Sequence, residues 1–191
     1  MNSQDQEELK KSFNGRFSTS ESTRANYARG EDTYDPVLSK AVVFPETNEE
    51  VSKILSLCNE HKIPVVPFGT GTSLEGNVVG NDKGITISLE KMNKVLSVNA
   101  EDFDCRVQAC VTKEQLNEYL REDGVFFPID PGANAAIGGM ASTSASGTMA
   151  VKYGTMKTVI TGLTVVLPNG DIINTGSRTK KTSAGYNLTN L

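Results

Sequence analysis

A glycine-rich loop reads Pro67-Phe68-Gly69-Thr70-Gly71-Thr72-Ser73-Leu74-Glu75-Gly76 and follows directly on an apolar run over residues 63–68. Glycine lets the backbone adopt positive φ and approach a ligand closely. Consecutive backbone N–H groups in such a turn form a nest that binds anions. The hydroxyls of Thr70, Thr72 and Ser73 add donors, and the loop contains no Lys or Arg. The pattern is typical of a phosphate bound mainly by backbone dipoles, although the loop taken alone could also be a structural turn.

Two familiar phosphate-binding motifs do not fit this loop. A Walker A motif needs a lysine after its last glycine, and Asn77 follows Gly76. A Rossmann G-x-G-x-x-G motif needs a glycine at position 74, where the chain has Leu74. The loop is therefore neither a Walker A motif nor a Rossmann dinucleotide-binding motif.

A second stretch of small residues reads Asp130-Pro131-Gly132-Ala133-Asn134-Ala135-Ala136-Ile137-Gly138-Gly139-Met140-Ala141-Ser142-Thr143-Ser144-Ala145-Ser146-Gly147. It contains no bulky aromatic residue and no Lys or Arg, so it is hard to explain as protein core. We expect it to lie against something large and flat that is not protein, with its hydroxyls near phosphate or ring heteroatoms. The alternative is a flexible linker, but Ile137 and Met140 provide apolar anchors that favour order.

Hydrophobic periodicity around these loops predicts two α+β lobes, at about residues 36–100 and 101–191, behind an N-terminal arm over residues 1–35. A T-x-x-E capping box at Thr47 predicts the start of a helix in the first lobe, and Thr112 to Gln115 predicts a second box in the other lobe. Gly124 is expected to cap that second helix. Strands are expected over residues 41–44, 63–68, 84–89, 95–99 and 103–111, with a hairpin around the turn at 168–170.

Composition excludes several classes of protein. The 191 residues are 37% hydrophobic and 22% charged, as in ordinary globular proteins. A net charge of -4 argues against nucleic acid or anionic membrane as a partner. No apolar run approaches the roughly 20 residues of a transmembrane helix.

The cysteines and the histidine add further limits. Cys58, Cys105 and Cys110 lack metal-site spacing and indicate small core or surface residues in a reducing compartment, with Cys105 and Cys110 on opposite faces of one strand. The single histidine, His61, excludes a cluster of several histidines within this chain. The N-terminus has no apolar signal core and carries early acids, which a mitochondrial transit peptide lacks.

In their order and spacing, the two loops resemble those of the FAD-binding domain of vanillyl-alcohol-oxidase-type (PCMH-type) flavoproteins. The resemblance covers about residues 34–191 and is closest to the branch of D-lactate dehydrogenases and glycolate oxidases. Further matches are Lys152-Tyr153-Gly154-Thr155, the hairpin over 162–170, and Ser183-Ala184-Gly185-Tyr186-Asn187-Leu188. It implies a two-lobed α+β domain with FAD across the cleft between the lobes, in a chain that is truncated before the cap, or substrate, domain.

The resemblance also implies which residues bind FAD. The first loop would contribute Pro67, Phe68, Gly69, Thr70, Gly71, Thr72, Ser73 and Leu74. The second loop and its continuation would contribute Asp130, Pro131, Gly132, Ala133, Gly138, Gly139, Ala141, Ser142, Thr143, Ser144, Gly147, Tyr153 and Gly154. FAD should be bound non-covalently, because no histidine lies between Pro64 and Gly84 and because Cys110 precedes the second loop.

For the complete enzyme, the resemblance implies oxidation of a D-2-hydroxy acid, D-lactate first among them, to the 2-oxo acid. Hydride would pass to flavin N5, and electrons would go on to an acceptor such as cytochrome c. Alternatives are an oxidase of the same fold, a stand-alone FAD-binding electron-relay subunit, and a nucleotide-binding module without flavin.

This chain is expected to contain no catalytic residue and no metal ligand, because the family's histidines, acids and divalent metal belong to a later cap domain. Residues 1–191 alone are therefore expected to be inactive. The family resemblance implies a mitochondrial location. The absence of a transit peptide from this chain leaves the cytoplasm as the alternative.

Overall fold

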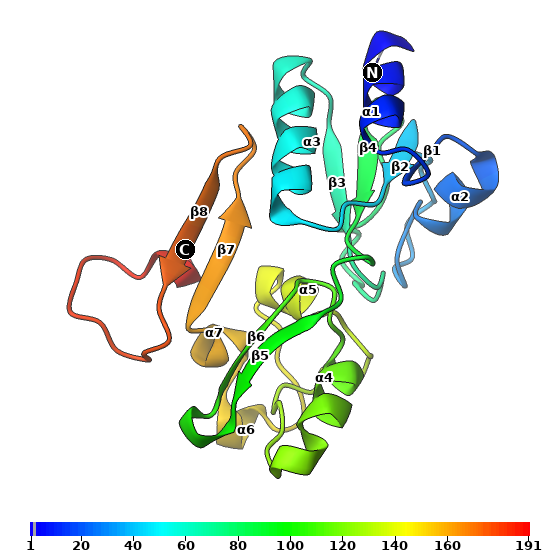
Figure 1. Cartoon of the computed structure of the whole chain (residues 1–191). Coiled ribbons are helices and arrows are strands. Elements are labelled where there is room, and N and C mark those ends of the chain that lie inside the picture. The colour runs from blue at the N-terminus through cyan, green and yellow to red at the C-terminus, as the bar shows by residue number, and fades with distance from the viewer. Residues whose placement is uncertain (2) are drawn as a thin grey trace. The chain divides into compact units, whose positions relative to one another are not determined.

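The computed structural model describes residues 1 and 3–191, which divide into two compact units (Figure 1). Unit 1 comprises Met1–Met92 and Val166–Ile172, and unit 2 comprises Asn93–Val165 and Ile173–Leu191. Helices and strands occur in both units, which confirms the predicted α+β class.

Unit 1 is built on a four-stranded sheet in the order β1-β2-β4-β3. β2, β4 and β3 run parallel, and β1 pairs antiparallel with β2 at the edge. In parallel α/β sheets, ligands bind beyond the carboxyl ends of the strands. The glycine-rich loop leaves β3 at that end. The strands are β1 (Phe17–Ser18), β2 (Ala41–Val43), β3 (Val65–Phe68) and β4 (Ile85–Ser88).

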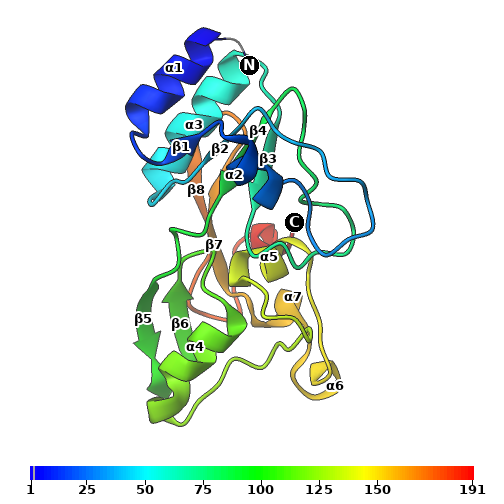
Figure 2. The same ribbon diagram turned by 90° about the vertical axis from the view of Figure 1, so that its right-hand side faces the viewer.

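Helices α1 (Ser3–Ser12) and α3 (Asn48–Glu60) lie side by side in unit 1 (Figure 2). A short helix, α2 (Glu21–Asn26), follows β1. Alternate residues of a strand point to the same side of a sheet. The apolar residues on one side of this sheet pack against the apolar faces of α1 and α3. Full burial of a Val, Leu, Ile or Phe side chain in this core contributes about 1.5–3 kcal/mol. The buried residues of this hydrophobic core are Leu9, Phe13, Ala41, Val43, Ile54, Cys58, Ile63, Ile85 and Ile87.

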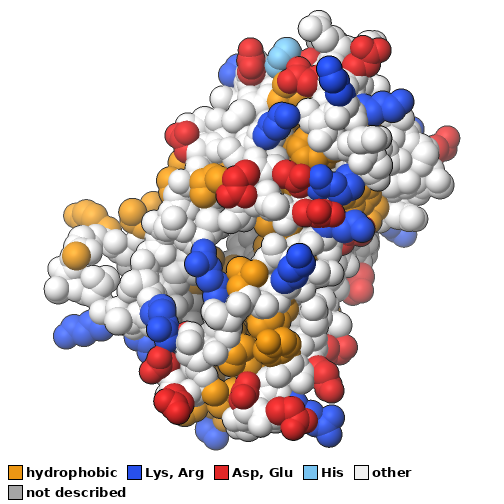
Figure 3. Space-filling model, viewed as in Figure 1, with side chains coloured by type: hydrophobic (Ala, Val, Ile, Leu, Met, Phe, Trp, Pro, Cys, Tyr) orange, Lys and Arg blue, Asp and Glu red, His pale blue; other side chains and the backbone are white. Residues whose placement is uncertain are grey.

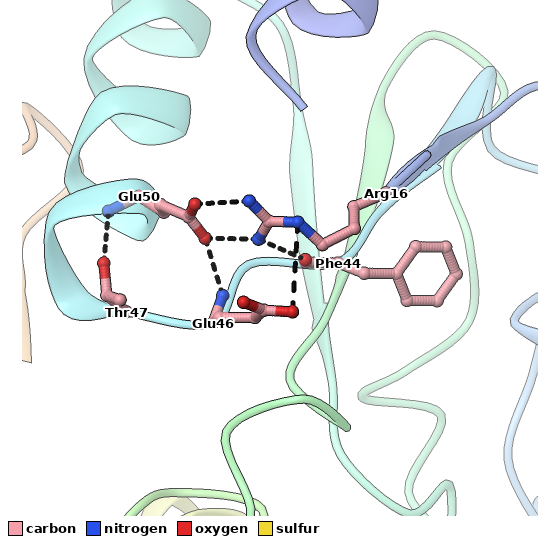
Figure 4. Close-up of polar contacts among 5 residues, drawn as sticks. All are labelled: Arg16, Phe44, Glu46, Thr47 and Glu50. Atoms are coloured by element: carbon pink, nitrogen blue, oxygen red, sulfur yellow. Dashed lines mark hydrogen bonds and ion pairs between the residues drawn. The ribbon is translucent and has the colours of Figure 1, made fainter. Parts of the chain in front are cut away.

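The capping box predicted at the start of α3 is half formed (Figure 4). The Thr47 hydroxyl accepts the Glu50 N–H at 3.2 Å, as expected. The Glu50 carboxylate, however, accepts the N–H of Glu46 at 2.7 Å and forms an ion pair with Arg16. Arg16 comes from the segment before β1, so the first turn of α3 is tied to the N-terminal arm.

Unit 2 combines short strands and short helices. β5 (Val95–Asn99) pairs antiparallel with β6 (Asp104–Val107). β7 (Gly162–Val166) forms the predicted hairpin with β8 (Ile172–Gly176), and the end of this hairpin, Val166–Ile172, is assigned to unit 1. Its helices are α4 (Lys113–Leu120), α5 (Ile137–Ser142), α6 (Ala150–Tyr153) and α7 (Met156–Val159), with 3-10 turns at Ala100–Asp102, Arg121–Asp123 and Leu188–Asn190. Two small buried clusters form its core, Val111, Leu116 and Leu120 in one and Ile129, Met140 and Met156 in the other.

The strand predicted over 103–111 was too long. Phe103 has φ +55° and stands before β6, which ends at Val107. Cys110 therefore lies beyond the strand and is buried, whereas Cys105 on β6 is exposed, so the two cysteines do not share a strand. Cys110 and Val111 are buried although they lie beyond β6, so apolar character alone extends the predicted strand too far.

The predicted caps around α4 are confirmed in part. The Thr112 hydroxyl accepts the Gln115 N–H at 3.2 Å, but the Gln115 side chain donates to the Asn93 carbonyl at 2.8 Å instead of returning to the cap. Gly124 has φ +68° and ends the 3-10 turn that follows α4, which confirms the glycine cap.

The surface carries mixed charge. On the face drawn in Figure 3, acidic and basic side chains are interspersed, in keeping with a net charge of -4. Across the described part of the chain, every helix is too short or too polar to span a lipid bilayer.

Candidate cofactor-binding site

The first glycine-rich loop folds over a buried ring of its own strand. Phe68, the last residue of β3, is 6% exposed and lies edge-on to Tyr27 with 5.0 Å between ring centroids. Gly71 has φ +74°, and a Cβ atom there would lie 2.8 Å from Cζ of Phe68. Only glycine combines that backbone angle with that close approach. The loop conformation is therefore fixed by packing against the protein.

This folding leaves a row of backbone donors without protein partners. Within residues 1 and 3–191, the N–H groups of Gly71, Thr72, Ser73 and Leu74 donate to no protein acceptor. Consecutive free N–H groups of this kind suit the oxygens of a phosphate. The Thr72 hydroxyl lies 3.4 Å from that of Thr70, and the Leu74 side chain is 68% exposed. The loop thus fits the pyrophosphate of a dinucleotide without any basic side chain.

The second loop contains a short helix, α5, that docks on the chain just before α4. The N–H of Ile137 donates to the Val111 carbonyl and the N–H of Gly138 to the Ala109 carbonyl, both at 2.8 Å. A Cβ atom on Gly138 would lie 2.8 Å from the Ala109 Cβ. Gly138 is therefore required for backbone packing within unit 2. This order excludes the flexible-linker alternative for this part of the loop.

The remaining glycines of the second loop fall into two groups. A Cβ atom on Gly147 would collide with the Asp130 backbone, so Gly147, like Gly138, shapes the protein itself. Around Gly132, which has φ +89°, no atom beyond the two neighbouring residues lies within 4 Å of an added Cβ. At Gly139, apart from the neighbouring residues and the backbone of α5, the nearest atom is the Ala136 Cβ at 4.0 Å. Gly132 and Gly139 thus leave room for a ligand to approach the backbone.

Two hydroxyls of the second loop donate to backbone carbonyls of their own helix. Ser142 donates to the Gly138 carbonyl at 3.0 Å, and Thr143 donates to the Gly139 carbonyl at 3.1 Å. A hydroxyl has one proton to donate, so each would have to leave its helix carbonyl before donating to a phosphate. Ser144 has φ +49° and is exposed, and Ala141 packs against the Ile129 cluster.

A lysine that the sequence patterns did not reveal anchors the start of the second loop. The Lys113 ammonium lies 2.7 Å from Oδ1 of Asp130, which also accepts the Gly132 N–H at 3.3 Å. The Lys113 hydrogen bond holds the pKa of the Asp130 carboxyl below its usual range. This contact joins residues 17 positions apart in the sequence, so periodicity could not show it.

The last predicted site residues are engaged with protein neighbours. The Tyr153 ring lies edge-on to Phe126 with 5.5 Å between centroids, and the Lys152 ammonium stands 4.9 Å from the Tyr153 ring centre. Gly154 has φ +81° and packs so closely on Thr158 that a Cβ would collide with its hydroxyl. Among residues 1 and 3–191, no group of His, Cys, Asp and Glu side chains is placed to bind a metal ion.

The similarity of this chain to a known protein family covers both loops. The model of the FAD binding domain family matches residues 39–176. The chain is 48% identical over 177 residues to a protein named "Probable D-lactate dehydrogenase, mitochondrial" from Danio rerio, covering 91% of this chain and 36% of that protein. It is 51% identical over 150 residues to "D-lactate dehydrogenase [cytochrome], mitochondrial" from Arabidopsis thaliana, covering 78% of this chain and 26% of that protein.

A solved structure supports the fold independently. The chain superposes on alkyldihydroxyacetonephosphate synthase with a TM-score of 0.86 at 22% identity, over 99% of this chain and 37% of the other. In each of these comparisons, the chain spans a quarter to somewhat more than a third of the other protein. Since the family model matches most of its residues, the chain belongs to the FAD binding domain family of PCMH-type flavoproteins.

Proposed function

We propose that the chain is the FAD-binding part of a flavin-dependent dehydrogenase that oxidises a D-2-hydroxy acid, with D-lactate as the preferred substrate. The observation that carries the proposal is the similarity to D-lactate dehydrogenases of Danio rerio and Arabidopsis thaliana at 48% and 51% identity. When bound, FAD supplies the acceptor for the hydride that leaves the substrate α-carbon.

In this proposal, the chain's own residues bind and orient the cofactor. The N–H groups of Gly71, Thr72, Ser73 and Leu74 donate to the pyrophosphate. Gly132 and Gly139 let the dinucleotide approach the backbone of the second loop, and the Lys113–Asp130 ion pair fixes the beginning of that loop. Binding is non-covalent, because His61 is engaged with Asp5, at 3.0 Å between Nδ1 and Oδ1, and neither loop contains a histidine or cysteine.

The electron acceptor and the location form the finer part of the proposal. The names of both relatives include "mitochondrial", and that of the Arabidopsis protein includes "cytochrome". We extend both features to this protein, so cytochrome c would reoxidise the reduced enzyme in mitochondria.

The test is anaerobic mixing of the complete, FAD-loaded polypeptide with D-lactate, L-lactate or glycolate. D-lactate should bleach the visible absorption of the flavin much faster than the other two acids. Equal rates with both lactate enantiomers would overturn the substrate assignment, and no bleaching by any acid would point to an electron-relay subunit. Mixing the reduced protein with oxidised cytochrome c or with oxygen then distinguishes a dehydrogenase from an oxidase of the same fold.

A further inference from the structure

Residues 30–34 of the N-terminal arm run along the first glycine-rich loop, and they precede the residues 39–176 that the family model matches. A Cβ atom on Gly30 would lie 2.5 Å from the Gly71 carbonyl oxygen and 3.0 Å from the Ser73 carbonyl oxygen. The arm and the loop therefore meet backbone to backbone. Any side chain at position 30 would push the loop out of place.

One hydrogen bond fixes the direction of a loop peptide. The N–H of Glu31 donates to the Gly71 carbonyl at 2.9 Å. The peptide between Gly71 and Thr72 is trans and planar, so its carbonyl and its N–H point in opposite directions. Because the carbonyl faces the arm, the Thr72 N–H faces away from it. This N–H is one of the donors without a protein acceptor in the described residues.

A buried carboxylate holds the arm in the shape that presents the Glu31 N–H. Asp32 is 8% exposed, and its Oδ2 accepts the N–H of Gly30 at 3.0 Å. Its Oδ1 accepts the N–H of Tyr34 at the same distance. The Tyr34 ring in turn packs on Gly76, where a Cβ atom would lie 2.7 Å from the ring. Asp32 thus bridges both sides of Glu31 within a single turn.

We infer that Asp32 is a positioning residue for FAD, which acts through the Gly30–Tyr34 turn to aim the Thr72 N–H at the pyrophosphate. The inference rests on the proposed binding of FAD by this loop. Asp32 itself touches only the arm, and its two acceptor oxygens fix the Glu31 N–H, which fixes the Gly71 carbonyl. The arm would then be part of the cofactor site rather than a surface appendage.

The experiment compares Asp32→Ala, Asp32→Asn and the control Asp35→Ala in the complete polypeptide. Asp35 is an exposed carboxylate in the same segment, so its removal matches the change of charge. Flavin titration of the apoprotein gives the Kd for FAD. The phosphorus NMR resonances of FAD at saturation report the surroundings of the bound pyrophosphate, and the thermal midpoint of the apoprotein reports stability.

Asp32→Ala should raise the Kd about tenfold or more, the scale of a lost charge-assisted hydrogen bond. Its phosphorus resonances should move toward those of free FAD. Asp32→Asn keeps one acceptor oxygen and should fall between Asp32→Ala and the wild type, whereas Asp35→Ala should match the wild type. A lower midpoint with wild-type Kd and wild-type resonances would mean a purely structural role and would overturn the inference.

Two further outcomes keep the test decisive. Should Asp32→Ala fail to fold, Asp32→Asn and Gly30→Ala replace it, and unchanged resonances in both folded variants would overturn the inference. Should the wild-type protein itself bind no FAD, the proposed function falls first and the inference falls with it. The wild-type titration therefore distinguishes the two failures.

Discussion

Arg16 forms a bidentate ion pair with Glu50, in which each terminal guanidinium nitrogen donates to a different carboxylate oxygen at 2.5 Å (Figure 4). Arg16 Nη1 also donates to the Phe44 carbonyl at 3.2 Å. Both side chains are about one quarter exposed. Such a bidentate pair is stronger than an ordinary surface ion pair. It joins the N-terminal arm to the first turn of α3.

Because of this ion pair, the free energy of unfolding should depend on pH in the acid range. The Arg16 hydrogen bonds lower the pKa of Glu50 from 4.5 to about 2. A carboxyl with a lowered pKa in the folded state stabilises the protein above its unfolded pKa and loses that contribution as the pH falls. Glu50→Gln should lower the free energy of unfolding by about 1–3 kcal/mol at neutral pH. The difference from the wild type should shrink as the pH falls from 4.5 towards about 2.

Urea unfolding at a series of pH values measures this effect. The control is Glu49→Gln, because Glu49 is an exposed carboxylate in the same helical turn. Its stability should stay within about 0.5 kcal/mol of the wild type, as for most surface substitutions. A Glu50→Gln variant whose stability runs parallel to that of the wild type down to acid pH would contradict the prediction.

Gly71→Val should abolish FAD binding in a folded protein. Valine resists positive φ, and its Cβ would approach the Phe68 ring at 2.8 Å, so the loop must leave its present path. Gly15→Val is the matched control, since Gly15 has φ +75° but no atom within 4 Å of an added Cβ. Both variants strain the backbone, and only the first should release the cofactor. FAD content is read from the absorption spectrum after gel filtration, and wild-type content in Gly71→Val would refute the prediction.

The sequence predicted the first loop better than the second. Periodicity predicted β3 and composition predicted the glycine-rich loop after it, because both patterns are local in the sequence. Order is predicted for residues 137–142, but the helix that forms there is not, because glycines such as Gly138 and Gly139 have poor helix propensity. Tertiary hydrogen bonds to Ala109 and Val111 override that propensity.

Contacts between distant residues were beyond any local pattern. Arg16 with Glu50, Lys113 with Asp130, and Glu31 with Gly71 each join segments that sequence spacing does not relate. The same holds for the Gly138 contact with Ala109, which gives this glycine a packing role. Composition could identify glycines that matter, but only the folded chain separates those that face protein from those that face open space.

Acid or heat should release intact flavin from the protein. His61 is the only histidine, and it belongs to the C-cap of α3, where it contacts Asp5. Cys58 and Cys110 are buried, and Cys105 lies on β6, outside both loops. After denaturation, the flavin should appear in the supernatant, and its fluorescence should be absent from the polypeptide band of a denaturing gel. Flavin that migrates with the polypeptide would show a covalent bond.

Gly138→Val and Gly139→Val should have different effects, although the two residues are neighbours on α5. Gly138→Val should lower the stability of the apoprotein, and Gly139→Val should weaken FAD binding. At Gly138, the new side chain meets Ala109 at 2.8 Å, and overpacking of this kind destabilises a protein by about 1–3 kcal/mol. At Gly139, the side chain enters open space next to the Ala136 Cβ at 4.0 Å, so stability of the apoprotein should hardly change.

The Kd for FAD and the effect of FAD on the thermal midpoint should distinguish the two variants further. Gly139→Val places its methyl groups where the dinucleotide is proposed to approach, so it should raise the Kd for FAD while the apoprotein keeps its wild-type thermal midpoint. Gly138→Val should lower the midpoint of the apoprotein, and added FAD should recover part of the loss, because a ligand that binds only the folded state stabilises it. Thermal denaturation with and without FAD, together with flavin titration, measures both effects. If Gly139→Val bound FAD like the wild type, the open side of α5 would not face the cofactor, and the second loop would need a different role.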